Sequence, residues 1–100
     1  MQKFVLERLQ NWYLAQCDED WEHSYGVKID TLDNPGWSLE IDLTDTSLES
    51  RQFPTVHIQR DNQHDWIHCK IENSKFSGSC GPKNLEELLC RFLDWAELSA

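Results

Sequence analysis

Residues 25–43 read YGVKIDTLDNPGWSLEIDL, and this stretch predicts the hairpin on which the rest of the fold depends. Apolar and polar residues alternate on both sides of the DNPG sequence, which is typical of a turn. If residues 32–36 form the loop, Ile29 lies opposite Leu39. The same register predicts four further pairs: Lys28 with Glu40, Thr31 with Trp37, Val27 with Ile41, and Tyr25 with Leu43. Because opposed residues of an antiparallel pair share a face, the apolar residues of both strands then fall on one side.

The same alternation predicts two more strands, near residues 55–60 and 66–72. A strand turns successive side chains to opposite faces of its sheet. When Ile67 points toward the core, its neighbours Trp66 and His68 therefore point outward. The second half of the chain thus continues the sheet that the hairpin begins.

Helices are predicted before and after the strands, over residues 2–16 and 85–98. Both segments repeat apolar residues at spacings of three and four, which is the period of an amphipathic helix. In the second helix Asn84 suits the N-cap, and Glu87 stands three residues later in the capping-box position. A short fifth strand is expected around Phe76. The apolar stripe of the first helix consists of Val5, Leu6, Leu9, Trp12 and Tyr13.

These elements predict an α+β fold. Two amphipathic helices can cover only one face of a small sheet. We therefore expect a two-layer domain with an N-terminal helix, an antiparallel sheet of four or five strands and a C-terminal helix, both helices on one sheet face. No repeat or linker divides the chain, so residues 1–100 are expected to form a single domain.

Composition excludes several classes of function. Eighteen Asp and Glu against nine Lys and Arg give a net charge of −9, which we interpret as spread along the whole chain. This charge argues against a nucleic-acid or anionic-membrane binder, because both need clustered positive charge. No apolar run approaches the roughly 20 residues that span a bilayer, and the N-terminus lacks the pattern of a signal peptide. A cytoplasmic location is therefore expected.

The four cysteines are expected to be reduced. They form no CxxC pair and show no Cys/His grouping at metal-site spacing. Without a secretion signal, free thiols are the default, so neither a disulfide framework nor a metal or other cofactor is predicted. The residues concerned are Cys17, Cys69, Cys80 and Cys90.

The open face of the sheet is the first candidate binding surface. An outward Trp66 among polar residues is typical of an interface anchor, because tryptophan is enriched in binding hot spots. Two alternatives stay open: a face that is simply solvated, and a Trp66 that packs under the loop at residues 44–52. His57 and His68 are expected to be cross-strand neighbours on this face, without a third ligand for a metal. The other candidate contact residues there are Asp30, Glu40 and Asp42.

An acidic cluster after the first helix is the second candidate. It consists of Asp18, Glu19, Asp20 and Glu22, with His23 beside them. A solvated loop, a contact for a basic partner, and an acid–base or metal site all fit these residues. The second helix also ends in acidic residues, Asp94 and Glu97, where the helix dipole disfavours negative charge. Replacing Glu97 by Gln is therefore expected to be neutral or slightly stabilising.

Several motifs together resemble the immunity protein 53 family. They are LQNWY at 9–13, QCD at 16–18, DWEH at 20–23, YG at 25–26, TLDNPGW at 31–37, IDL at 41–43, DWI at 65–67 and, in the closing helix, NL at 84–85 and FLDW at 92–95. The resemblance covers nearly the whole chain, and the TLDNPGW and DWEH strings are its most specific parts. It implies a small α+β protein, encoded beside a bacterial polymorphic toxin, that neutralises this toxin by binding and has no enzymatic activity.

Two classes of function are compatible with the sequence. The favoured hypothesis is an immunity protein whose acidic surface binds a basic toxin of the nuclease class. It expects no nucleic acid or membrane as a partner and a monomeric free chain. The alternative is a small metal-assisted hydrolase or nucleotide-handling enzyme that uses Asp18, Asp20 and His23.

Overall fold

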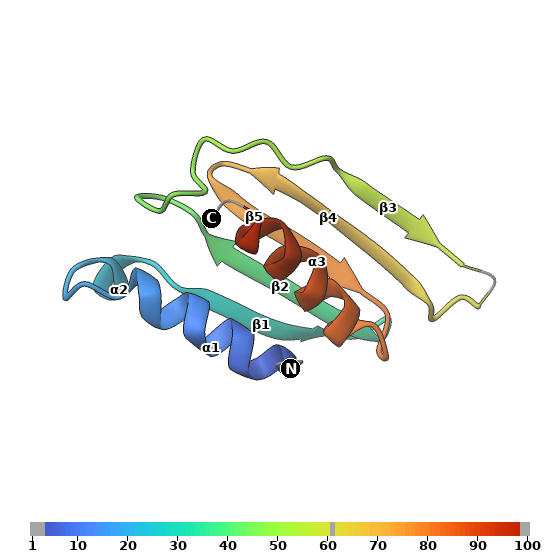
Figure 1. The fold of residues 1–100 in the computed structure, drawn as a ribbon. Coiled ribbons are helices and arrows are strands. Elements are labelled where there is room, and N and C mark those ends of the chain that lie inside the picture. Colours follow the sequence, from blue (N-terminus) through green and yellow to red (C-terminus); the bar gives the residue numbers. More distant parts are fainter. Residues whose placement is uncertain (1–3, 61, 99–100) are drawn as a thin grey trace.

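The computed structural model describes residues 4–60 and 62–98 of the chain, and Figure 1 shows its arrangement. Five strands form one sheet, and the helices lie along one of its faces. The predicted α+β class with both terminal helices is confirmed; the predicted helix start at residue 2 lies outside the described residues. The elements are α1 (Val5–Gln16), α2 (Trp21–Ser24), β1 (Val27–Leu32), β2 (Gly36–Asp42), β3 (Val56–Gln59), β4 (Trp66–Glu72), β5 (Lys75–Cys80) and α3 (Leu85–Glu97).

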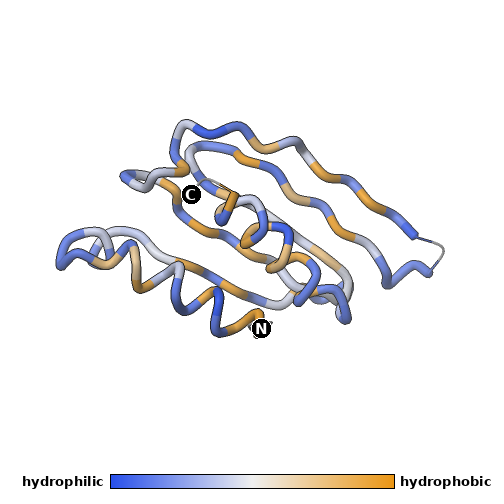
Figure 2. The backbone as a smooth tube through the Cα atoms, in the orientation of Figure 1, coloured by the Kyte–Doolittle hydropathy of each residue, from blue (hydrophilic) through white to orange (hydrophobic). Residues whose placement is uncertain are grey.

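The predicted hairpin has the predicted register. Ile29 pairs with Leu39 and Lys28 pairs with Glu40, and the ladder runs from the pair of Val27 with Ile41 to the turn. The pair of Tyr25 with Leu43 lies beyond the ends of both strands. The alternation of hydropathy along the strands in Figure 2 explains why this register is the more stable one. A register shifted by one residue would turn the apolar side chains toward water.

The last strand differs from the prediction, because β5 is six residues long and lies at the centre of the sheet. The strand order is β1-β2-β5-β4-β3, with all neighbours antiparallel. Asn73 and Ser74 connect β4 to β5 with φ angles of 55° and 60°, the backbone that a two-residue hairpin turn requires. A Cβ at Gly78 would lie 2.8 Å from the Leu88 side chain, so the glycine lets α3 pack directly on the central strand.

The core lies between the sheet and the helices. Among the helices, α3 contributes most of the buried side chains of this core, and its Leu88, Phe92 and Leu93 are fully buried. Helix α1 contributes less than predicted: Leu9 is buried, but 64% of Leu6 and 39% of Tyr13 is exposed. The reason is that α1 runs beside the β1 edge of the sheet and packs mainly on α3, so only a narrow part of its stripe is covered.

The loop at residues 44–52 packs on the helix side of the sheet. Leu48 is buried in the core, and Arg51 donates a hydrogen bond to the Trp95 carbonyl at 2.8 Å. The Trp95 indole N–H in turn donates to the Gln52 carbonyl at 2.9 Å. The loop therefore does not cover Trp66, which lies on the opposite face, and this alternative is wrong.

The start of α3 is stabilised differently from the predicted capping box. Asn84 occupies the N-cap without a capping hydrogen bond from its side chain, and it donates instead to Asp65 at 2.9 Å. The Glu87 carboxylate accepts two hydrogen bonds from Arg60, at 3.1 and 2.7 Å. The capping box fails because Arg60, which follows β3, offers Glu87 a charged partner that the local sequence does not show.

The acidic end of α3 has a partner within the fold. Arg8 of α1 donates hydrogen bonds to both carboxylate oxygens of Glu97, each at 2.9 Å, and to Asp94 at 2.8 Å. These bonds, first those to Glu97, raise the pKa of the Arg8 guanidinium above its usual value. Asp94 and Glu97 therefore serve to join the two terminal helices, and they are not evidence for a basic partner.

This contact reverses the expected effect of the Glu97→Gln substitution. We expect it to lower the free energy of unfolding by about 0.2–1 kcal/mol, because a partly exposed ion pair with Arg8 is lost. The difference from wild type should shrink in high salt, since salt screens the pair. Urea unfolding at low and high ionic strength measures both effects. A variant as stable as wild type at low salt would show that the helix-dipole penalty offsets the ion pair.

Candidate functional site

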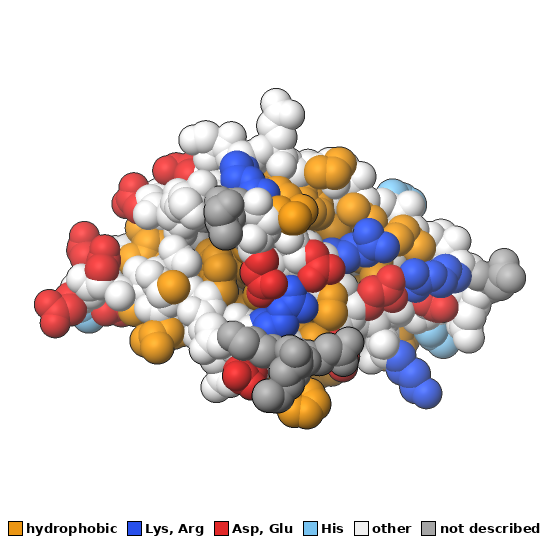
Figure 3. All heavy atoms as spheres, viewed as in Figure 1, with side chains coloured by type: hydrophobic (Ala, Val, Ile, Leu, Met, Phe, Trp, Pro, Cys, Tyr) orange, Lys and Arg blue, Asp and Glu red, His pale blue; other side chains and the backbone are white. Residues whose placement is uncertain are grey.

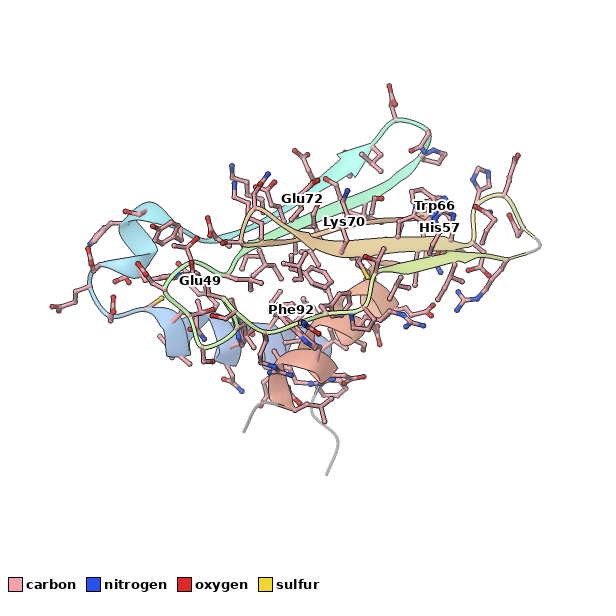
Figure 4. The ribbon with its side chains drawn as sticks, turned by 90° about the horizontal axis from the view of Figure 1, so that it is seen from above. Glu49, His57, Trp66, Lys70, Glu72 and Phe92 are labelled. Carbon is pink, nitrogen blue, oxygen red and sulfur yellow. The ribbon has the colours of Figure 1, made fainter. Side chains whose placement is uncertain are left out.

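The side of the sheet that faces away from the helices is a broad, open surface. Figure 4 shows His57, Trp66, Lys70 and Glu72 on this side and Phe92 on the other. The strand registers arrange its side chains in rows across the sheet. We call it the open face; its rows are Asp42–Lys75–Glu72, Lys28–Glu40–Ser77–Lys70, Asp30–Ser38–Ser79–His68–His57, and Trp66–Gln59.

An aromatic cluster marks one end of the open face. His57 and His68 are cross-strand partners, as predicted, and their rings stack with centroids 3.9 Å apart. Trp66 lies against His68 with a centroid distance of 5.0 Å and is half-buried. Burial, and then the nearby His57, lower the pKa of His68 below its ordinary value. Burial within this aromatic cluster therefore favours the neutral form of His68.

Gly36 lies where β2 passes close to the end of β5, next to the aromatic cluster. A Cβ at this position would collide with the Cys80 carbonyl, whereas it would only reach ordinary contact with the Trp66 ring, at 3.5 Å from Cζ2. The glycine of the TLDNPGW turn thus has a second role beyond the turn, because it allows β2 and β5 to approach closely.

Small side chains form a depression beside this cluster. Ser38, Ser77 and Ser79 lie on β2 and β5, between the histidines and the charged rows. The depression has a volume of about 460 Å³, and His68 and Lys70 form part of its wall. The sequence reasoning missed this feature, although the alternating serines at 77 and 79 signal small residues on one face of a strand. A partner could place a side chain here.

Charges on the open face are interleaved. Glu40 lies 3.6 Å from the Lys75 ammonium, and Lys70 lies 3.5 Å from Glu72. Two of the predicted contact residues also have local roles, because the Asp30 carboxylate accepts the Thr31 N–H and the Asp42 carboxylate accepts the Thr44 N–H. The face brings Trp66, His68, Asp30, Glu40 and Asp42 onto one surface, as predicted, but that surface is not uniformly acidic.

The excess negative charge lies elsewhere, and it is not spread along the whole chain. Residues 9–50 contain ten carboxylates and one lysine, a net charge of −9, while the rest of the chain contains eight acidic and eight basic residues. Figure 3 shows acidic side chains gathered at the end of the molecule that carries α2. The Trp21 indole holds α2 to the following loop by donating to the Thr44 carbonyl at 2.9 Å. The fold thus has an acidic end beside a nearly neutral open face.

The predicted acidic cluster at this end divides into two kinds of residue. The Asp18 carboxylate accepts the N–H groups of Asp20 and Trp21, at 3.0 and 2.9 Å. The Glu22 carboxylate accepts those of Asp18 and Glu19, at 3.0 and 2.9 Å. Backbone N–H groups lower the pKa of both carboxyls: first that of Trp21 for Asp18, and for Glu22 first its own N–H and then those of Asp18 and Glu19. Asp18 and Glu22 therefore build the turn, whereas the exposed carboxylates of Glu19 and Asp20 project from it.

Nothing in this turn assembles a catalytic centre around His23. Asp18 is occupied by backbone donors, and the cluster lies on an exposed turn. Within residues 4–60 and 62–98 no group of three or more His, Cys, Asp or Glu is placed to hold a metal ion. Cys69 and Cys80 are buried free thiols, and burial raises the pKa of each to about 11. Neither thiol is activated as a nucleophile.

The fold and the open face together define a class of protein in which an exposed surface is the functional feature. An exposed sheet face with an aromatic cluster and a shallow depression is suited to contact with a macromolecule. No helix in the described part of the chain is long and apolar enough to cross a membrane.

Comparison with known proteins places the chain within this class. A family model described as immunity protein 53 matches residues 6–97, and the chain belongs to this family. The resemblance seen in the sequence motifs is confirmed, and the family assigns an immunity role against a toxin. Neither the curated proteins nor the solved structures include a match to this chain.

Proposed function

We propose that this chain, acting as one domain and as a monomer in the cytoplasm, neutralises a bacterial polymorphic toxin by binding it through the open face. The observation that carries the proposal is the half-buried Trp66 on a sheet face that none of the helices in residues 4–60 and 62–98 covers. A ring that is already packed on His68 loses little freedom when a partner covers it. The proposed contact residues are Trp66, His68, Asp30, Glu40 and Asp42.

The acidic end supplies attraction over a longer range. The carboxylates of the acidic turn, and those of Asp42, Asp45 and Glu49 beside it, create a negative field at the α2 end, which accelerates the approach of a basic protein. A nuclease is such a protein, because it must bind a polyanion. We therefore assign a basic, nuclease-like toxin as the partner, with Glu19 and Asp20 as steering residues and with Asp18 and Glu22 as the supports of their turn.

Binding accounts for the structure better than catalysis. The candidate acid–base residues of the alternative hydrolase are Asp18, Asp20 and His23, and the first of these is held by two backbone N–H groups. The open face and the acidic end, in contrast, are both suited to contact with another protein.

Charge reversal at the acidic turn tests the steering step. We expect the double variant Glu19→Lys with Asp20→Lys to associate with the toxin about tenfold more slowly at low salt, with little change in dissociation. The salt dependence of association should also weaken. Surface-immobilised kinetics with the toxin encoded beside this chain, at two ionic strengths, measures these rates.

A matched variant separates steering from damage to the turn. Glu19→Gln with Asp20→Asn removes the charges without adding new ones, and it should fall between wild type and the double lysine variant. Association rates that are equal in all three proteins, and independent of salt, would contradict a role of the acidic end.

A further inference from the structure

The outer edge of β1 is an unpaired strand edge. In the described part of the chain β1 pairs with β2 alone, because it lies at one end of the order β1-β2-β5-β4-β3. Such an edge presents backbone N–H and C=O groups to any chain that can extend alongside it. The six residues Val27–Leu32 make β1 longer than β3, the four-residue strand at the opposite edge.

The hydrogen-bonding pattern shows which residues point outward. The Asp42 N–H donates to the Gly26 carbonyl at 3.1 Å, beside the pair of Val27 with Ile41. Because bonded and non-bonded pairs alternate along an antiparallel ladder, Val27, Ile29 and Thr31 turn their backbone groups away from β2. The Asp30 carboxylate accepts the outward Thr31 N–H at 3.0 Å. The N–H groups of Val27 and Ile29 are then the donors left for a further strand.

An apolar groove runs beside this edge on the helix side. It lies between α1 and β1 and has a volume of about 360 Å³, with Leu9, Tyr13 and Val27 among its lining residues. Ile29 faces the helix layer by its register, yet 40% of it is exposed because α1 does not cover it. Alternate side chains of an added strand would fall into this groove.

The negative charge around the β1 edge indicates which kind of segment can pair with it. Asp30 and Asp33 belong to this hairpin, the acidic turn precedes it, and Lys28 is the one cation in residues 9–50. A second copy of this chain would bring another −9 charge to the same place, which opposes self-pairing. A basic segment with alternating apolar residues matches both the field and the groove.

We propose that an extended segment of the toxin, with alternating basic and apolar residues, pairs with β1 as a sixth strand and inserts its apolar side chains between α1 and β1. This inference rests on the proposed function, because it names a further contact in the same complex. The open face and the β1 edge are continuous, since Lys28 and Asp30 lie at the margin of both.

Amide hydrogen exchange tests the backbone pairing directly. We expect the amides of Val27 and Ile29 to exchange at least about tenfold more slowly once a catalytically inactive form of the neighbouring toxin is bound, because each gains a hydrogen bond. The amides of β3, at the opposite edge, are the internal control and should change little. Equal protection at both edges, or none at β1, would overturn the proposal.

A pair of variants tests the same point by affinity. Ile29→Pro removes an outward N–H that β2 does not use, whereas Ile29→Thr keeps this N–H and the β-branched shape while it removes the apolar contact. We expect the Pro variant to bind the toxin about tenfold more weakly than the Thr variant. If the toxin binds wild type but does not distinguish the two variants, and the β1 amides stay unprotected, the sixth strand is wrong and the open face stands. If wild type does not bind the toxin, both proposals fall.

Discussion

Replacing Phe92 by Ala is expected to lower the free energy of unfolding by about 3–5 kcal/mol. The side chain is fully buried, and it joins three parts of the fold. Its ring meets Trp12 of α1 edge-on at 5.0 Å and Phe76 of the central strand at 5.1 Å, and it lies 6.2 Å from Trp95. Removing the ring leaves a cavity that rigid elements on every side cannot close.

Urea unfolding of this variant needs a control that changes apolar area without opening a cavity. Leu14→Ala serves, because Leu14 lies on α1 with 70% of its surface exposed, and the change should alter stability by no more than about 0.5 kcal/mol. If Phe92→Ala and Leu14→Ala unfolded at the same urea concentration as wild type, the packing of α3 on the sheet would be wrong.

The largest effect on binding is expected from Trp66→Ala. Loss of an aromatic anchor that the partner buries costs about 2–4 kcal/mol, which corresponds to a dissociation constant raised about 30- to 1,000-fold. Most of this change should be a faster dissociation rate, because the ring acts after the charges have brought the proteins together. The Trp66→Phe variant keeps an aromatic face beside His68 and should recover part of the affinity.

Leu98→Ala is the matched control for this measurement. Leu98 is the exposed apolar residue that follows α3, on the helix side of the molecule, and 79% of its surface is exposed. We expect this variant to bind the toxin like wild type. If Trp66→Ala also binds like wild type, the contact surface lies elsewhere, and the acidic turn with Glu19 and Asp20 is the next surface to test.

Much of the sheet could be predicted because its information is local. The hairpin register follows from the alternation on both sides of one turn, and the outward positions of Trp66 and His68 follow from the parity of β4. The central place of β5 could not be predicted, since strand order depends on which strand best fits under α3. Gly78, which opposes strand formation in isolation, is suited to that place because Leu88 packs on it.

Long-range ion pairs account for the errors at the two ends of α3. Arg8 meets Glu97 across 89 positions of sequence, and Arg60 draws Glu87 away from the capping role that its spacing suggests. The helix-dipole rule treats Glu97 as unfavourable because it considers α3 alone and not the contact of Glu97 with α1. The same limitation applies to α1, where Leu6 fits the apolar stripe but the sheet does not reach it.

The sequence predicts which residues lie on the candidate site, but it does not predict how their side chains interact there. Strand parity gathers Trp66, His68 and the carboxylates of β1 and β2 on one face. Parity does not show that Lys75 lies beside Glu40, or that Asp18 is held by backbone donors while Asp20 projects freely. These distinctions depend on side-chain geometry, and they separate the residues that shape the surface from those available to a partner.

A titration of the cognate toxin with the purified chain tests the central claim most directly, because it distinguishes neutralisation by binding from neutralisation by catalysis. The proposed function predicts that residual toxin activity falls in proportion to the added chain and reaches its minimum at a stoichiometric ratio, with both proteins recovered at unchanged mass. Toxin activity that is unaffected by excess chain, or that is abolished by a small fraction of an equivalent, would contradict it.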